Sequence, residues 1–417
     1  MKISYFPVKW KRAHILAFKK PGKDKLFPQN YRPISLLPTM SKIFEKIILN
    51  RILDFEINTP TLIPEQFGFR NNRSTVQQLA RITNNISINY NINKSTAMIL
   101  LDIEKAFDTV WHKGLIYKLF KIGMPIYIIK IIQHYLKNRT FNLIIDKVKS
   151  KTQSIAAGVP QGSILGPRLF LYYINDIPKN PKSELALFAD DTAILSSSWS
   201  KRVALKNVVD HYNLIKHYFD QWKIKINENK TEVIIFSKKY KKEIIEKVVI
   251  NDLELDIKKS VKYLGVHLDS KLSFSEHIKQ TRSKSYAAIS ALHNLMNKKS
   301  ALSTKNKIIL YKVVFRPIML YACPIWSSTF KSNINALETI QNKVLRKIAK
   351  VDPEVSNEKI RNQLEIQTIW DRIEAFTQDF YDKIKNQNIE ILNEVGKYNH
   401  DNAPFKLKYK LPHNILL

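Results

Sequence analysis

The chain has 417 residues, 44% of them hydrophobic, which is enough to bury a large core divided over more than one unit. It carries 68 Lys and Arg against 36 Asp and Glu, a formal net charge of +32 that favours a partner rich in phosphate. A single cysteine, Cys323, excludes an intramolecular disulfide and a zinc site built from cysteines, and no apolar run approaches the ~20 residues of a membrane span.

The abundance of lysine, isoleucine and asparagine has a second explanation, which is an AT-rich coding sequence. Such a bias accounts for lysine in place of arginine, but it explains less easily why bases outnumber acids nearly twofold. The composition therefore supports a nucleic-acid partner without identifying the chemistry.

Hydrophobic periodicity predicts a chain rich in helices, with short strands near its start. Apolar residues recur at every third or fourth position, the helical spacing, in 41–55 and 126–139. Short strands are expected around the first of these helices, between about residues 8 and 95. Beyond Ser270 the spacing is helical again, and the expected segments are 273–296, 305–326 and 334–350.

A continuous apolar run from Ser95 to Leu101 ends abruptly in Asp102. This pattern is typical of a buried strand that delivers a carboxylate to a site at its C-terminal end. The residues that follow, 103–120, have roughly helical spacing, so Asp102 is expected just before a helix. An ordinary helix N-cap is therefore the alternative explanation for this aspartate.

The sequence FADD at 188–191 separates two short apolar runs, 184–188 and 192–196. Each run predicts a short buried strand, so Asp190 and Asp191 are expected at the tip of a hairpin. Neighbouring carboxylates repel each other and raise each other's pKa unless a cation sits beside them or both reach solvent. A solvated Asp-Asp turn is the alternative, and a further acid at a strand end, Asp102, argues against it.

Six sequence blocks stand out in chain order: KPGKDKLFPQNYRPISLLPTMSKIFEKII (20–48), EQFGFRNNRSTVQQL (65–79), LDIEKAFDTVWH (101–112), GVPQGSILGPRLFLYYINDIP (158–178), FADD (188–191) and KYLGVHLDSKLSF (262–274). Together they resemble the reverse transcriptase of a non-LTR retrotransposon, and within that group the jockey-like elements of insects. Each block alone is weak evidence, but the similarity covers nearly the whole chain in the family's order. It implies an α+β fold of the right-hand polymerase type.

The resemblance divides the chain into regions. Residues 1–268 are expected to form fingers and palm, with fingers at about 8–95 and 113–157 and palm at about 96–112 and 158–268. The palm is expected to be an antiparallel sheet with helices on one face. A helical thumb is expected at 269–350, followed by a C-terminal extension of unassigned role at 351–417. The family's upstream endonuclease and its further fingers sequence are not recognised in this chain.

The reaction of such enzymes joins a primer 3′-hydroxyl to a deoxynucleoside triphosphate, and two divalent metals about 3.5–4 Å apart can clamp it. The resemblance assigns Asp102 and Asp190 as carboxylates shared by both metals, with Asp191 and the backbone carbonyl of Ile103 as further ligands. Mg²⁺ is the expected ion, with Mn²⁺ as the alternative. Asp108 is expected instead to bind nearby backbone or a basic partner.

Basic residues are expected to hold the triphosphate, since its charge exceeds what two metals neutralise. Arg32 is the first candidate, because its guanidinium can engage phosphate oxygens in pairs, and Lys20 is a second. Lys230 matches the position at which such polymerases place a lysine that protonates departing pyrophosphate. A surface lysine in the loop before a strand explains Lys230 equally well.

The resemblance also gives three residues near the nascent base pair. Phe107 matches a bulky aromatic under the incoming sugar, where its ring would collide with a 2′-hydroxyl; a helix residue packed in the core is the alternative. Gln161 matches a residue that touches the template or the incoming nucleotide. Gly162 would permit close backbone approach, in a segment that otherwise reads as a plain loop.

Five further residues are expected near the nucleic acid. Arg70 and Arg73 are assigned either to the template strand or to the local fold of the fingers. Tyr263, Leu264 and Gly265 lie in a strand-like run that resembles a primer grip, in which an aromatic ring contacts a sugar or base. Ordinary strand packing would produce the same sequence pattern.

The sequence therefore predicts an RNA-directed DNA polymerase whose partners are an RNA template, a DNA primer or target DNA, and deoxynucleoside triphosphates, with no membrane partner. Its oligomeric state is left open. Two alternatives remain: a catalytically silent nucleic-acid-binding remnant or host-adopted copy, and a relative of intron-encoded maturases. The expected location is intracellular, in the cytoplasm as a ribonucleoprotein and in the nucleus at integration. The lysine cluster at 238–242 is a candidate for nuclear entry or a solvated basic turn.

Overall fold

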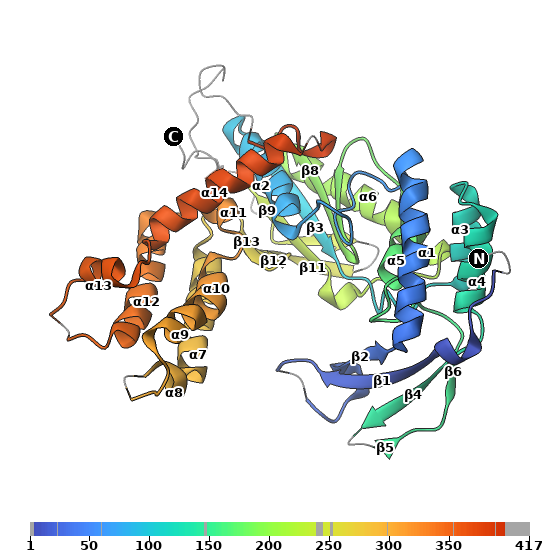
Figure 1. Ribbon diagram of the computed structural model, residues 1–417. Helices are drawn as coiled ribbons and strands as arrows, with labels where there is room; N and C mark the ends of the chain where they lie inside the picture. The colour runs from blue at the N-terminus through green and yellow to red at the C-terminus, as the bar shows by residue number, and fades with distance from the viewer. Residues whose placement is uncertain are drawn as a thin grey trace. The chain divides into compact units, whose positions relative to one another are not determined.

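The computed structural model describes residues 4–22, 24–59, 61–145, 148–238, 245–250, 253–297, 299–352, 354–387 and 389–396 (Figure 1). Helices and sheets are both extensive, which confirms the α+β class. The chain divides into two compact units, the first formed by 1–71, 101–193 and 210–231 and the second by 72–100, 194–209 and 232–417. Residues 239–242 of the lysine cluster lie outside the described residues.

The first unit contains a mixed sheet of short strands. Strand β1 (Arg12–Lys19) pairs antiparallel with β2 (Tyr31–Leu36) and parallel with β4 (Arg139–Ile145). Two short strands, β5 (Val148–Lys149) and β6 (Gln153–Ile155), pair antiparallel with β4. This sheet places β2, and with it Arg32, beside β1.

The first unit contains the two helices predicted at 41–55 and 126–139, and others that were not predicted at their observed bounds. They are α1 (Thr39–Asn58), α3 (His112–Lys121), α4 (Ile126–Leu136), α5 (Gly166–Tyr173) and the part of α6 (Lys201–Gln221) that begins at Asp210. The predicted helix at 126–139 is three residues shorter than expected, because Lys137 has extended backbone and the chain enters β4 at Arg139.

A buried lysine joins three of these helices. The Lys118 ammonium on α3 donates hydrogen bonds of 2.6 Å each to the Tyr173 carbonyl on α5, to Asp176 Oδ1 and to the Tyr218 hydroxyl on α6. It also lies 3.7 Å from the centre of the Trp222 ring. Burial lowers the pKa of Lys118 to about 8, and the Asp176 carboxylate partly offsets this effect. The cation thus fixes the helices around it.

The second unit contains the strands β3 (Ser95–Leu101), β9 (Glu232–Phe236), β11 (Leu253–Lys258) and β10 (Lys247–Ile250), in the order β10-β11-β9-β3. Strands β3 and β9 are antiparallel, as expected for a palm, and so are β10 and β11. The prediction of an antiparallel sheet is wrong for one pair, because β11 runs parallel to β9. The reason is that β10 comes between β9 and β11 in the chain but lies at the edge of the sheet. Strand β11 turns back from β10 and therefore runs beside β9 in the same direction as β9.

Helices dominate the second unit after Ser270, as predicted. They are α7 (Ser275–Ala291), α8 (His293–Met296), α9 (Thr304–Leu310), α10 (Arg316–Leu320), α11 (Cys323–Trp326), α12 (Lys331–Ala349), α13 (Asn357–Leu364) and α14 (Ile369–Asn386). A π-helical turn, Tyr311–Phe315, connects α9 to α10. The helix α2 (Thr75–Asn91), which the sequence did not predict, packs against α11.

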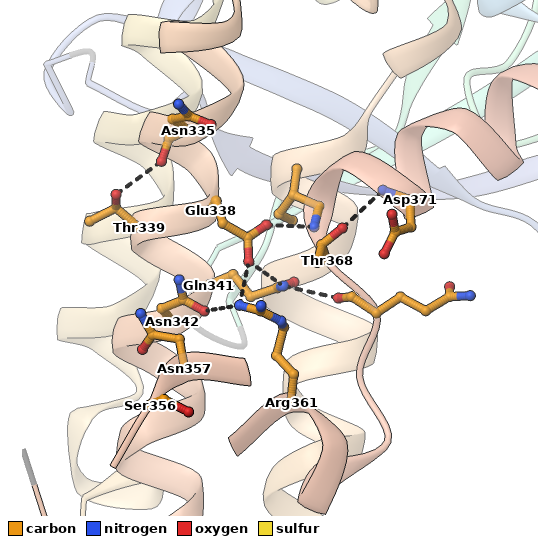
Figure 2. A network of polar contacts seen from close by, with 12 residues as sticks. Asn335, Glu338, Thr339, Gln341, Asn342, Ser356, Asn357, Arg361, Thr368 and Asp371 are labelled. Atoms are coloured by element: carbon orange, nitrogen blue, oxygen red, sulfur yellow. Dashed lines mark hydrogen bonds and ion pairs between the residues drawn. The ribbon is translucent and has the colours of Figure 1, made fainter. Parts of the chain in front are cut away.

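One half-buried acid, Glu338, connects the helices α12, α13 and α14 (Figure 2). Glu338 on α12 accepts hydrogen bonds from the Ile369 amide of α14 at 2.6 Å and from Arg361 Nη1 of α13 at 3.3 Å. Gln341 Nε2 donates to the same carboxylate, at 3.2 Å, and to the Gln367 carbonyl. Residues 351–396 therefore continue the helical packing of α12 for as far as they are described. Among all the residues that the structure describes, no helix combines the length and the apolar character needed to span a bilayer.

Candidate active site

The FADD sequence forms the predicted hairpin in the first unit. Strand β7 (Glu184–Phe188) and strand β8 (Asp191–Ser198) are neighbours, and the tight turn between them consists of Ala189 and Asp190. Ala189 has a left-handed backbone with φ of 56°. Asp190 is therefore in the turn, and Asp191 is the first residue of β8.

Two residues that were not among the predicted site residues, Gln66 and Gly68, support this turn. Gln66 is buried, and its Oε1 accepts hydrogen bonds from the Ala189 amide at 2.9 Å and the Gly68 amide at 2.8 Å. A Cβ atom on Gly68 would lie 2.3 Å from the Ala189 nitrogen, so only glycine fits there. Both residues belong to the block at 65–79, whose Gln and Gly were the available signal.

Asp102 follows β3 directly, as predicted, but no helix begins after it. Residues 104–108 form turns, with Lys105 at φ of 48°, and α3 starts only at His112. The Asp102 carbonyl accepts from the Asn227 amide at 2.8 Å, and the Glu104 amide donates to the Lys225 carbonyl. These bonds to 225–227 hold the chain extended past the strand. The N-cap explanation for Asp102 is therefore wrong.

Lys230 pairs with the Asp102 side chain. It ends a short 3₁₀ turn, Glu228–Lys230, and its Nζ lies 2.7 Å from Asp102 Oδ2. The pair is partly solvated, with the Lys230 side chain 63% exposed and that of Asp102 33% exposed. Lys230 is thus a surface lysine before a strand, as the alternative expected, and its ammonium also neutralises one of the three predicted metal ligands.

The three carboxylates interact electrostatically. Burial raises the pKa of Asp190, and the Asp102 charge raises it further, while Lys230 and Arg32 act in the opposite direction. Solvent reaches the Asp191 side chain, yet the protein atoms around it, and then the charges of Asp190 and Asp102, raise its pKa to about 6. The acids are thus close enough to destabilise one another's charged forms.

This repulsion predicts a variant that is more stable than the native chain. Above pH 6 the Asp191 carboxylate is charged against its neighbours, and this costs stability that a neutral side chain avoids. We expect Asp191→Asn to raise the metal-free free energy of unfolding at pH 7 by about 1 kcal/mol, after allowance for solvent screening. Urea unfolding in EDTA measures it.

The sign of the effect follows from the direction of the shift. Because the folded-state pKa is raised, the cost is present above about pH 6 and disappears as pH falls to about 4, where both states are protonated. The gain from Asp191→Asn should therefore vanish near pH 4. Asp210→Asn, on an exposed acid of α6, is the control. A gain that is equal at both pH values, or equal in the control, would contradict the prediction.

The donor chemistry fits a divalent cation, but the side chains are not gathered into a ligand set. Carboxylate oxygens are the ligands that Mg²⁺ prefers. Among the described residues, however, no group of three or more His, Cys, Asp or Glu side chains is arranged to hold a metal ion. One reason is visible, since Lys230 occupies the Asp102 carboxylate. A bound cation would have to displace this ammonium.

The backbone carbonyl of Ile103, a predicted metal ligand, is not used by the hydrogen bonds of the neighbouring bridge. Ile103 is buried and forms an isolated antiparallel bridge with Ile226. The two hydrogen bonds that flank this bridge use the Asp102 carbonyl and the Glu104 amide. The Ile103 carbonyl therefore accepts neither of the two hydrogen bonds of this bridge.

The loop at 158–162 is a turn, as predicted, and it packs against other parts of the first unit. Gly162 has φ of 105°, and a Cβ there would lie 2.9 Å from the Ser35 carbonyl oxygen of β2. The close approach that Gly162 permits is thus to β2. Gln161 Nε2 donates to both Oδ1 and Oδ2 of Asp108 at 3.0 Å. The hydrogen-bond partner of the Asp108 side chain is thus this amide, while the expected basic partner acts only through its charge, since Lys105 lowers the pKa of Asp108.

Phe107 is half-buried in the turn after Asp102 and does not lie on a helix. Its ring stacks on Phe170 of α5, with centroids 4.9 Å apart, and meets Phe69 edge-on at 6.0 Å. These contacts fix the ring while part of it stays accessible. The geometry is compatible with a sugar contact. The alternative, a helix residue packed in the core, is wrong about the helix, although the ring does pack against the buried Phe170.

The basic candidates differ in their surroundings. Arg32 is exposed on β2, within range of Asp190, whose pKa it lowers. Lys20 follows β1 and is half-buried, with its amide bonded to the Asn30 carbonyl. Arg70 donates to the carbonyls of Ile63 at 2.8 Å and Gln66 at 3.3 Å, which supports the alternative that it stabilises the local fold. Arg73 lies in the second unit, just before α2.

The predicted primer grip is a hairpin turn of the second unit, and not a continuous strand. Strands β12 (Ser260–Tyr263) and β13 (Val266–Asp269) pair so that Tyr263 faces Val266. Leu264 and Gly265, with φ of 44° and 86°, form the two-residue turn, which fits the twist of a hairpin. The Tyr321 hydroxyl donates to the Leu264 carbonyl at 2.8 Å. Tyr263 itself is buried, so its ring is not presented for an aromatic contact.

Comparison with known proteins agrees with this arrangement. The family described as reverse transcriptase (RNA-dependent DNA polymerase) matches residues 18–268, which include Asp102, Asp190 and Asp191. The chain belongs to the reverse transcriptase family. Its mixture of helices and sheets is consistent with the right-hand polymerase fold, and reverse transcriptases generally use a divalent metal.

Relatives come from transposable elements of insects. The reverse transcriptase chain is 33% identical to the probable RNA-directed DNA polymerase from transposon X-element of Drosophila melanogaster, over 100% of this chain and 46% of the relative. It is 32% identical to the RNA-directed DNA polymerase from mobile element jockey of the same species, over 95% of this chain and 44% of the relative. The chain thus spans less than half the length of these relatives.

Solved structures show a more distant likeness. Apo telomerase from Candida tropicalis aligns with a TM-score of 0.44 and 12% identity, covering 93% of this reverse transcriptase chain and 64% of the telomerase chain. Telomerase from Candida albicans, in complex with a fragment of telomeric RNA, aligns with a TM-score of 0.45 and 10% identity, covering 87% and 68%.

Proposed function

We propose that this chain is the RNA-directed DNA polymerase of a non-LTR retrotransposon, and that it extends a primer 3′-hydroxyl with deoxynucleotides on an RNA template. The observation that carries the proposal is the electrostatic coupling of Asp102, Asp190 and Asp191, from separate parts of the chain, beside Lys230 and Arg32. Family membership and the transposon relatives support it.

The three aspartates and the Ile103 carbonyl would hold the divalent ions, Mg²⁺ or Mn²⁺. Such ions lower the pKa of the attacking hydroxyl and neutralise charge on the phosphates. The negative charges of the carboxylates repel one another, so cation binding relieves this repulsion. Mg²⁺ is the better candidate, because it accepts one or two carboxylates together with substrate phosphates.

Lys230 and Arg32 would act on the triphosphate. Once the Asp102 carboxylate is released from Lys230, the ammonium is available to donate a proton to the departing pyrophosphate. Arg32 is exposed on β2 and within electrostatic range of Asp190, so its guanidinium can bind phosphate oxygens beside the acids. Lys20 is the weaker candidate, since it lies beyond the end of β1.

The partners follow from the same reaction: an RNA template, a DNA primer or target DNA, and deoxynucleoside triphosphates. The excess of cations, 68 against 36 acids, supports binding to the phosphate backbones. We place the protein in the cytoplasm as a ribonucleoprotein and in the nucleus when target DNA is primed.

A second function is favoured by one observation. The Asp102–Lys230 ion pair and the lack of a gathered ligand set in the described residues fit a protein that binds nucleic acid without synthesis. Primer extension separates the two. The chain is incubated with a DNA primer on an RNA template, deoxynucleotides and Mg²⁺, with EDTA as the control. Extension that requires the cation supports the polymerase, and tight binding without extension in Mg²⁺ or Mn²⁺ selects the binding protein.

Phe107 provides a test of substrate selection. The half-buried ring is held by Phe170 and Phe69, so it cannot move aside for a 2′-hydroxyl without losing these contacts. We expect Phe107→Ala to incorporate ribonucleotides at least about tenfold more efficiently relative to deoxynucleotides, which corresponds to about 1.4 kcal/mol of discrimination. Single-nucleotide insertion kinetics with matched nucleotide pairs measure the ratio. An unchanged ratio in an active variant would remove Phe107 from the sugar site.

A further inference from the structure

We propose that Asp108 is a positioning residue, which fixes the side-chain amide of Gln161 and thereby sets the hydrogen-bonding group that Gln161 presents to the substrate. This inference rests on the proposed function, in which the 158–162 loop lies beside the nascent base pair. It concerns the reverse transcriptase reaction, but it assigns a role to an acid outside the predicted metal ligands.

The contact between the two side chains is specific. Gln161 Nε2 lies 3.0 Å from each Asp108 carboxylate oxygen. An ionised carboxylate accepts hydrogen bonds and cannot donate, so it binds the amide nitrogen and repels the amide oxygen. Asp108 therefore excludes the flipped amide, in which Oε1 and Nε2 exchange places. In the favoured state Oε1 is directed away from Asp108, where it can accept from a donor group of the substrate.

The position of the loop does not depend on this side-chain contact. The Val159 amide donates to the Phe107 carbonyl at 2.7 Å, and the Gly158 amide donates to the Val110 carbonyl at 2.9 Å. On the other side, the Ser35 amide donates to the Gln161 carbonyl at 2.8 Å. Backbone bonds thus hold residue 161 from two directions. Removal of the Asp108 carboxylate should release the amide without releasing the loop.

Glycine makes the close packing of these segments feasible. A Cβ on Gly158 would lie 2.6 Å from the Asp108 carbonyl oxygen, and Gly158 has φ of 88°, so another residue would push the loop away from Asp108. The Gly158 carbonyl also lies 2.8 Å from His112 Nε2. The turn at 104–108 and the loop at 158–162 therefore form one rigid support for the amide.

The surroundings of the Asp108 carboxylate explain why it needs the Gln161 amide. It is half-buried, and burial raises its pKa while the bond from Gln161 and then the charge of Lys105 lower it. A buried carboxylate is costly unless it is hydrogen-bonded, and the Gln161 amide supplies those bonds. The competing explanation is that the contact only stabilises the fold, and the kinetic experiment below separates the two.

The kinetic experiment compares Asp108→Ala, Asp108→Asn, Gln161→Ala and the double variant Asp108→Ala/Gln161→Ala in primer extension. We expect Asp108→Ala to raise KM for the deoxynucleotide about tenfold, with a smaller change in kcat, because binding orientation is lost. Asp108→Asn keeps one acceptor oxygen and should recover part of the effect. The double variant should be no worse than Gln161→Ala, since Asp108 acts through Gln161.

Glu104→Gln is the matched control. It removes the same charge from the same turn, but Glu104 is paired with Lys225, at 3.4 Å, on the protein surface. Its KM should match that of the native chain. Additive losses in the double variant, or a lower thermal stability of Asp108→Ala with native KM, would overturn the inference and leave Asp108 as a structural residue.

A spectroscopic experiment tests the contact without activity. The chain is labelled with ¹⁵N in glutamine side chains, and the Gln161 amide resonance is identified by its loss in Gln161→Ala. We expect this resonance to move in Asp108→Asn and to stay in place in Glu104→Gln. An unmoved resonance refutes the positioning role even in an active enzyme. A resonance that moves in a chain that does not synthesise DNA supports the contact and refutes the proposed function instead.

Discussion

Replacing Asp190 by Asn is expected to lower the rate of primer extension by roughly 10³-fold, because electrostatic stabilisation at a reacting centre is worth several kcal/mol. Asp190 is in the turn between β7 and β8, where it interacts with Asp102 and is opposed by Lys230 and Arg32. The amide has nearly the same shape but no charge with which to hold a divalent ion. The measurement is single-turnover extension of a DNA primer on an RNA template in Mg²⁺.

Binding must survive for this result to be informative. Asp190→Asn should bind primer-template at least as tightly as the native chain, because it removes a negative charge near phosphates. Asp210→Asn, an exposed acid on α6, provides the matched control and should keep native activity. Full activity of Asp190→Asn would contradict the assignment of the site, whereas loss of both binding and folding would be seen in its unfolding curve.

Replacing Glu45 by Ala is expected to cost about 3–5 kcal/mol of stability, the largest effect of a single substitution that we foresee. Glu45 on α1 is fully buried, and its Oε2 accepts from the Ile164 amide at 2.8 Å and the Leu165 amide at 3.3 Å. Its Oε1 accepts from the Ser41 hydroxyl at 3.0 Å. Alanine leaves these donors without an acceptor, beside the loop that carries Gln161.

Two milder variants separate the causes. Glu45→Gln keeps an acceptor oxygen for the two amides and should lose less stability than Glu45→Ala. Ser41→Ala removes one hydrogen bond and should cost about 1 kcal/mol. Urea unfolding of the first unit, followed by tryptophan fluorescence, measures all three. If Glu45→Ala were as stable as Ser41→Ala, the two backbone amides would have found other acceptors.

The acids of the site could be predicted because their signals are local. Asp102 ends an apolar run that forms β3, and FADD lies between two such runs that form β7 and β8. Strand formation follows from the apolar pattern, and a residue at the end of a strand is placed by the strand itself. The helices at 39–58 and 331–349 were predictable for the same reason, since their apolar residues recur with helical spacing.

Other elements were missed because distant contacts decide them. The apolar spacing after Asp102 suggested a helix, but hydrogen bonds to Lys225 and Asn227 hold residues 102–104 in a bridge, turns follow at 104–108, and the helix begins only at His112. Helix α2 was missed because its buried face includes polar residues such as Gln78, Thr83 and Asn84, which obscure the periodicity. The turn at Leu264–Gly265 was predicted as strand, because a leucine at positive φ has no sequence signal.

Motifs and apolar periodicity were enough to identify the family, the α+β class and three aspartates whose charges interact, because both signals depend on residues close together in the chain. The tertiary structure decided the partners of these residues: Lys230 on Asp102, Gln66 beneath the turn that holds Asp190, and Asp108 on Gln161. Each of these pairs joins residues more than 50 positions apart. Hydrogen bonds and ion pairs form wherever the folded chain brings two groups within bonding distance. A local sequence pattern therefore does not predict which distant residues become partners.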